Sequence, residues 1–199
     1  PDSGNYAALG FSEVSGIPYD AAFVRNHYVG RTFLNPSQLA REFGVKVKLN
    51  IINERVKGKR VVVVDDSIVR GTTARSCVMN LRNAGAKEVH IRISCPPHRF
   101  PCHYGIDFPD PKHLIANQFS HQEITKYLEA DSLGYLDTAG MVRATGREEN
   151  KFCMACFNGK YPVAVNPELD KMVFERRRER AESLVFAEES SPRLFNGKI

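Results

Sequence analysis

The sequence predicts an α/β fold, in which a doubly wound parallel sheet precedes a mostly helical or irregular C-terminal extension. Residues 61–64 are four consecutive valines, and such a run is typical of a parallel strand buried on both faces. An amphipathic helix is expected over residues 74–84, and residues 89–95 alternate between apolar and polar side chains. This strand–helix–strand order indicates a parallel sheet that is covered by helices.

Composition places the chain among ordinary globular proteins. It has 199 residues, 42% hydrophobic and 26% charged, enough for one α/β domain with extra segments. No apolar run reaches the roughly 18 residues of a membrane span, and no signal peptide is evident. The charge of +5 is scattered, so neither nucleic acid nor a membrane is an expected partner. Five unevenly spaced cysteines favour a reducing, cytoplasmic location. The first residue is Pro1, and we expect a missing N-terminal region.

The remaining elements follow in chain order. Residues 5–15 have helical spacing that stops at Gly16, and a short strand is expected over residues 21–24. Residues 26–50 are basic and irregular, which indicates a long functional loop. The helix over residues 74–84 ends at Gly85, where a left-handed residue would stop it.

A capping box, formed by Ser120 and Glu123, predicts the start of a further helix. A strand is expected over residues 133–136 and a helix over 168–187, followed by a loose tail. We therefore predict a first domain over residues 1–145, truncated at its N-terminus, and a C-terminal extension over residues 146–199.

The most informative segment is VVVVDDSIVRGTT, residues 61–73, between the buried strand and the following helix. Free N–H groups and the helix dipole at such a helix start hold phosphate. Gly71 permits close approach, and Ser67, Thr72 and Thr73 add hydroxyl groups. Asp65 and Asp66 require a partner between them, either sugar hydroxyls or Mg²⁺. The motif matches neither a P-loop nor a dinucleotide fingerprint. The alternative is a surface turn with solvated acids.

This segment resembles the phosphoribosylpyrophosphate (PRPP) loop of type I phosphoribosyltransferases. The string DDSIVRGTT resembles one branch, the amidophosphoribosyltransferases of purine synthesis. Four further segments carry the same resemblance: PDSG at residues 1–4, YVGRTF at 28–33, PCHYGID at 101–107 and CFNGKYP at 156–162. The resemblance runs from residue 1 to about residue 165, and it implies the type I phosphoribosyltransferase fold.

The resemblance also implies roles for individual residues. Asp65 and Asp66 match the acids that bind ribose and Mg²⁺, and Ser3 matches a third residue of the metal site. Residues 26–48 resemble the flexible loop that closes over PRPP, where Arg31 and Lys48 would stabilise charge. The positions that match the cradle of the 5′-phosphate are Ser67, Ile68, Val69, Arg70, Gly71, Thr72 and Thr73.

The activity implied is attack of ammonia on PRPP, which gives 5-phosphoribosylamine and pyrophosphate in the first step of de novo purine synthesis. The family takes this ammonia from glutamine in a separate N-terminal domain with an N-terminal cysteine, and that cysteine is missing from this chain. The resemblance further implies a homo-oligomer and inhibition by purine nucleotides.

The cysteines form two groups. Cys77 and Cys95 fall on apolar faces and are interpreted as structural thiols. Cys153 and Cys156 form a C-x2-C pair, which suits a metal or a cluster, and Cys102 lies in a loop. Zinc and free thiols are the alternatives. The resemblance to the iron–sulfur subgroup implies that these three thiols ligate a [4Fe-4S] cluster, whose fourth cysteine would precede Pro1.

Two other functions suit the same loop. One is a regulator that binds PRPP as a signal, and the other is a phosphoribosyltransferase that acts on a purine or pyrimidine base. No helix-turn-helix signature supports a regulator that binds DNA. The three loop cysteines and the GKYP segment have no role in base chemistry.

Overall fold

The computed structural model describes residues 2–25, 49–106 and 111–164. The chain divides into two compact units, Pro1–Lys160 and Tyr161–Ile199, and the second lies almost wholly outside the described residues. No helix among the described residues is long and apolar enough to cross a membrane. The predicted loop over residues 26–48, with Arg31 and Lys48, and the predicted helix over residues 168–187 lie outside the described residues.

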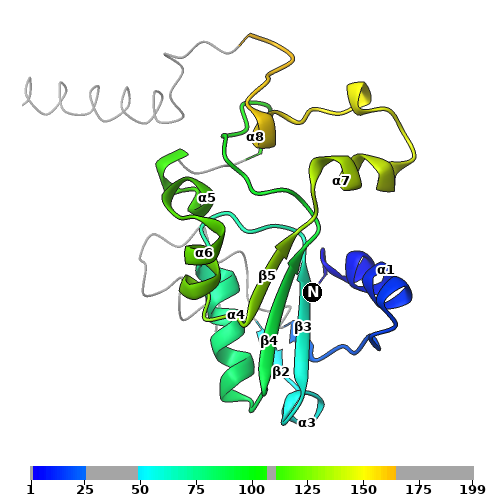
Figure 1. Cartoon of the computed structure of the whole chain (residues 1–199), viewed down its shortest axis with the longest axis vertical. Helices are drawn as coiled ribbons and strands as arrows, with labels where there is room; N and C mark the ends of the chain where they lie inside the picture. The colour runs from blue at the N-terminus through cyan, green and yellow to red at the C-terminus, as the bar shows by residue number, and fades with distance from the viewer. Residues whose placement is uncertain (1, 26–48, 107–110, 165–199) are drawn as a thin grey trace, which may run out of the picture. The chain divides into compact units, whose positions relative to one another are not determined.

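A three-stranded parallel sheet organises the first unit (Figure 1). Its strands in spatial order are β3 (Arg60–Asp65), β4 (Glu88–Ile93) and β5 (Ser132–Tyr135). Along the chain, helix α4 (Thr72–Asn83) follows β3 and precedes β4, and helix α6 (His121–Tyr127) follows β4 and precedes β5. These two helices lie on one side of the sheet, whereas α1 (Asn5–Ser15) packs beside β3 on the other. The predicted doubly wound α/β arrangement is therefore confirmed.

The core lies between the sheet and the two connecting helices. Strand β4 alternates as expected, with Val89, Ile91 and Ile93 almost fully buried on one face. The buried residues Val78 and Leu81 of α4 belong to the same cluster. The capping box of α6 is present, since the Glu123 N–H donates to Ser120 Oγ (3.3 Å) and the Ser120 N–H donates to Glu123 Oε2 (2.8 Å).

Two expectations need correction. Residues 61–64 are half-buried rather than buried on both faces, because β3 lies at an edge of the described sheet. Residues 49–51 were expected in the irregular loop but form strand β2 (Leu49–Ile51). This strand pairs antiparallel with β1 (Phe23–Arg25), which overlaps the short strand expected over residues 21–24.

Several short elements had no prediction. They are α3 (Asn53–Val56), the 3-10 turn Pro111–His113, α5 (Ile115–Gln118), α7 (Thr138–Thr145), the 3-10 turn Glu149–Lys151 and α8 (Ala155–Asn158). Residues 146–160, with α8, belong to the same compact unit as the sheet. The functional division at residue 145 stays a prediction.

Candidate functional site

The acid pair lies where β3 ends. Asp65 is the last residue of the strand, and its Oδ1 accepts a hydrogen bond from the Asp66 N–H at 2.9 Å. Ser67 Oγ donates to Asp66 Oδ1 at 3.0 Å. Burial raises the pKa of Asp65, and the negative charge of Asp66 adds to the rise. The site therefore concentrates negative charge at the carboxyl end of the sheet, where α/β folds bind ligands.

Gly4, the residue after Ser3, lies against Val64 and Asp65. A Cβ atom on Gly4 would lie 2.7 Å from the Val64 carbonyl oxygen and 3.2 Å from Asp65 Cα, so no larger residue fits without movement. The adjacent Asp2 makes an ion pair with Arg25, at 2.6 Å between Oδ2 and Nη1. The structure thus brings Gly4 next to Asp65, and the role of Ser3 in a metal site stays a prediction.

The predicted phosphate loop, residues 67–73, is anchored at two points. The Ile68 side chain is 3% exposed and belongs to the core, and the Val69 carbonyl accepts the Ile115 N–H at 2.9 Å. Gly71 is left-handed (φ 80°), and a Cβ there would lie 2.5 Å from Ile115 Cδ1. Glycine is therefore required by both conformation and space.

The end of this loop opens into α4. Gly71 caps the helix without a side-chain hydrogen bond, and the first helical residues, Thr72 and Thr73, are exposed. No side chain caps this helix start, so the hydroxyls of both residues and the N–H groups of the first turn can donate hydrogen bonds to a phosphate. Arg70 is also exposed, beside them.

Cys102 and the Cys153–Cys156 pair come from two segments that backbone hydrogen bonds hold together. The Arg99 and Phe100 N–H groups both donate to the Cys156 carbonyl, at 3.0 and 3.1 Å. The pKa of the Cys156 thiol is raised, chiefly by burial and in part by the charges of Cys102 and Cys153. Within the described ranges, no three His, Cys, Asp or Glu side chains form a group that could hold a metal ion. The cluster ligand set stays a prediction.

The other two thiols, Cys77 and Cys95, are half-buried against the hydrophobic core, which suits structural roles. Burial raises the pKa of Cys77 and of Cys95 to about 12. Cys95 follows β4, and its Sγ lies 3.7 Å from His98 Nε2. Both thiols are therefore protonated at neutral pH.

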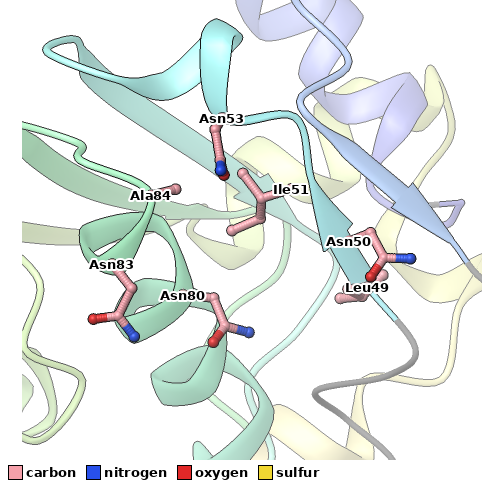
Figure 2. A pocket seen from close by; sticks show the side chains of 7 residues that line it. All are labelled: Leu49, Asn50, Ile51, Asn53, Asn80, Asn83 and Ala84. Atoms are coloured by element: carbon pink, nitrogen blue, oxygen red, sulfur yellow. The ribbon is translucent and has the colours of Figure 1, made fainter.

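Sequence reasoning missed Ile115 and Tyr127, whose side chains limit the space around Gly71. It also missed a recess of about 420 Å³ at the opposite end of α4 from the phosphate loop (Figure 2). Four asparagine amides surround this recess, at positions too far apart in sequence to form a motif. Its lining residues are Leu49, Asn50, Ile51, Asn53, Asn80, Asn83 and Ala84.

The known proteins that this chain resembles in sequence carry the same name, amidophosphoribosyltransferase. No protein-family model matches the chain. It is 53% identical over 165 residues to the amidophosphoribosyltransferase of Synechocystis sp., covering 83% of this chain and 33% of that protein. It is 55% identical over 166 residues to the amidophosphoribosyltransferase of Methanocaldococcus jannaschii, which covers 83% of this chain and 35% of that protein. The chain thus spans about a third of the length of the curated relatives it matches.

Two solved structures resemble the fold. Glutamine PRPP amidotransferase from B. subtilis, complexed with ADP and GMP, matches with a TM-score of 0.74 and 49% identity, over 84% of this chain and 38% of that one. A structure described as the allosteric regulatory enzyme of purine biosynthesis matches with a TM-score of 0.74 and 48% identity, over 85% and 37%. Over most of its length, the chain is therefore a homologue of part of the amidophosphoribosyltransferases, and it has the type I phosphoribosyltransferase fold of their solved members.

Proposed function

We propose that the protein carrying this chain is an amidophosphoribosyltransferase, which converts PRPP and ammonia into 5-phosphoribosylamine and pyrophosphate. The observation that carries the proposal is the course of residues 65–73, from an acid pair at the end of β3 to an uncapped start of α4. Identities near 50% to amidophosphoribosyltransferases support it.

The two halves of this segment suit the two halves of PRPP. The first turn of α4, with Thr72 and Thr73, would bind the 5′-phosphate. Asp65 and Asp66 would accept hydrogen bonds from the ribose hydroxyls. Their hard carboxylate oxygens also fit Mg²⁺, together with Ser3. Burial, with the charge of Asp66 beside it, raises the pKa of Asp65, and a bound cation would favour the charged carboxylate. Bound Mg²⁺ would supply charge stabilisation for the pyrophosphate.

The reaction itself needs positioning more than covalent help. The ammonia nitrogen forms a bond to the ribose carbon while the bond from that carbon to the pyrophosphate oxygen breaks, and the new ammonium group then loses a proton. Positive charge develops on the ribose and is offset by the carboxylates of Asp65 and Asp66. Arg31 and Lys48, outside the described residues, are proposed to offset the charge of the leaving group.

The test is Mg²⁺-dependent release of pyrophosphate from PRPP, with and without ammonia. The variant Asp65→Asn/Asp66→Asn should lose release, because it removes both charges from the site. The matched control is Glu148→Gln/Glu149→Gln, an exposed neighbouring acid pair far along the chain, which should keep it. PRPP binding without any release would instead favour a regulator, and release stimulated by a nucleobase but not by ammonia would favour a base transferase.

We further propose that Cys102, Cys153 and Cys156 supply three thiolates to a [4Fe-4S] cluster, with a fourth from outside this chain. The supporting observation is that the two segments meet at the Cys156 carbonyl and that their thiols influence one another. Soft thiolates are the donors such a cluster requires. Iron and sulfide analysis of the intact protein, with Cys156→Ser as the variant, tests this; zinc in place of iron would overturn it.

The proposal also covers the source of the ammonia, inhibition by purine nucleotides and the oligomeric state. Glutamine, processed outside these residues, would provide the ammonia. Because a relative's structure contains ADP and GMP, purine nucleotides are proposed inhibitors of this protein too, in a homo-oligomer. Inhibition of pyrophosphate release by ADP plus GMP, measured on the intact protein, tests the first point, and light scattering tests the second.

A further inference from the structure

Helix α5 holds the phosphate loop from behind. The Ile115 N–H donates to the Val69 carbonyl at 2.9 Å, in the middle of the loop. The Ile115 side chain is 2% exposed and occupies the space beside Gly71, where an added Cβ would come within 2.5 Å of it. The position of Ile115 therefore sets the position of both Val69 and Gly71.

This helix cannot fix its own position. It has four residues, and its N-cap, Leu114, makes no side-chain hydrogen bond. A helix of this length is far below the roughly 12 residues at which isolated helices become even marginally stable. Its conformation and placement must therefore be set by groups outside it.

Arg99 and Asn117 supply that restraint reciprocally. Arg99 Nη1 donates to the Ala116 carbonyl at 2.7 Å, while Asn117 Nδ2 donates to the Arg99 carbonyl at 2.8 Å. The same Asn117 amide group also reaches the Pro111 carbonyl at 2.9 Å. Two side chains thus join α5 to the segment at residue 99 in both directions.

The segment at residue 99 is itself fixed by the C-x2-C region. The Arg99 and Phe100 N–H groups share the Cys156 carbonyl, and a Cβ on Gly159 would lie 3.0 Å from the Phe100 ring. A continuous series of hydrogen bonds therefore runs from Cys156 through Arg99 and α5 to Val69.

We propose that Arg99 and Asn117 are positioning residues for the phosphate cradle, acting through Ile115. The proposal rests on the proposed function, in that the cradle binds the 5′-phosphate of PRPP. Neither side chain has to touch the substrate, because the binding groups are the N–H donors and hydroxyls at residues 71–73. A loop held in its binding geometry loses less freedom when the phosphate arrives, so affinity depends on the restraint.

Arg99→Met and Asn117→Leu, made in the longest native chain that contains these residues, remove the side-chain donors at similar size. Each should raise the KM for PRPP about five-fold, the scale of one lost charge-assisted or neutral hydrogen bond, while kcat changes little. Arg99→Lys should recover much of the loss, because its ammonium group can donate to Ala116. The control Arg60→Met removes an arginine that pairs with Glu88 at the other end of β3, and it should leave KM unchanged.

A second measurement needs no substrate. In the ligand-free protein, amide hydrogen exchange should be faster in Arg99→Met at Ile115 and at Arg75, whose N–H groups donate to the Val69 and Gly71 carbonyls, and it should be unchanged in Arg60→Met. Unchanged exchange in Arg99→Met would overturn the proposal, as would an equal rise of KM in Arg99→Met and in the Arg60→Met control. If the wild-type protein does not use PRPP, the proposed function fails, but the exchange data still decide whether Arg99 restrains the loop.

Discussion

Arg82 of α4 and Asp131, just before β5, make an ion pair that also holds the sheet. Arg82 Nη2 lies 2.9 Å from Asp131 Oδ2, and the same oxygen accepts the Val89 N–H at 2.6 Å. Arg82 further donates to the Glu129 carbonyl through Nε and Nη2. One carboxylate thus connects a helix, the central strand and the turn that leads into β5.

Asp131→Asn should lower the free energy of unfolding by about 1 kcal/mol, because the charge-assisted bonds weaken while the shape is kept. The hydrogen bond from Val89, with the charge of Arg82, lowers the pKa of Asp131 in the folded state. A lowered folded-state pKa contributes stability above the unfolded value, and this contribution is lost as pH falls. In urea unfolding between pH 7 and pH 3, the free energy of unfolding should fall less steeply with decreasing pH in the variant than in the wild type. An equally steep fall in the wild type and in Asp131→Asn would contradict this prediction.

Asp65→Asn should stabilise the ligand-free fold at neutral pH while it abolishes use of PRPP. Burial raises the pKa of this carboxyl, so the folded state binds the proton more tightly than the unfolded state. Stability from this residue is therefore present at low pH and falls as pH rises past the unfolded value of 3.8. Thermal unfolding at pH 7 measures the gain. A lower melting temperature in Asp65→Asn would show that the carboxylate supports the fold.

Gly4→Ala should destabilise the fold, because its Cβ would meet the Val64 carbonyl at 2.7 Å and push the Ser3 segment away from Asp65. The control is Gly10→Ala, inside α1, the helix whose N-cap is Gly4. No atom lies within 4 Å of its added Cβ, and alanine favours helix over glycine by roughly 0.5–1 kcal/mol. Chemical denaturation should therefore move the two variants in opposite directions.

Thiol labelling should divide the cysteines by burial. Cys77 and Cys95, whose pKa values are raised to about 12, should resist alkylation at pH 8, because almost no thiolate is present. Cys153 is exposed and should react first. Mass spectrometry of peptides after a short exposure to iodoacetamide measures the order. Early labelling of Cys95 would show that the segment after β4 opens in solution.

The sequence predicted those parts of the fold whose signals are local. The valines at residues 61–64, the alternation that buries Ile91, and the capping box at Ser120 are each decided by a few neighbouring residues, and all form the expected elements. Helix α7 was missed although it has similar signals, since Asp137 caps it and the left-handed Gly146 ends it. At eight residues, this helix spans little more than two turns, too few to show a clear apolar periodicity.

The candidate site was predictable only in part, for a physical reason. The roles proposed for Asp65 and Thr72 rest on a strand that turns into a helix, which is a local pattern. The support from α5 depends on contacts between Ile115 and residues more than 40 positions earlier in the chain. A four-residue helix has no periodicity of its own to show that it packs there, so only the folded chain brings it to light.

The contact of Ile115 with Gly71 has a consequence for engineering. Ile68 and Ile115 belong to the hydrophobic core, and both lie within or against the phosphate loop. A library that randomises Ile68, Val69 and Gly71 to obtain new ligand preferences would therefore be filtered for folding before any variant could be tested for binding. Diversity placed at the exposed positions Arg70, Thr72 and Thr73 avoids that filter, so these three sites are where altered selectivity can be sought without first restoring stability.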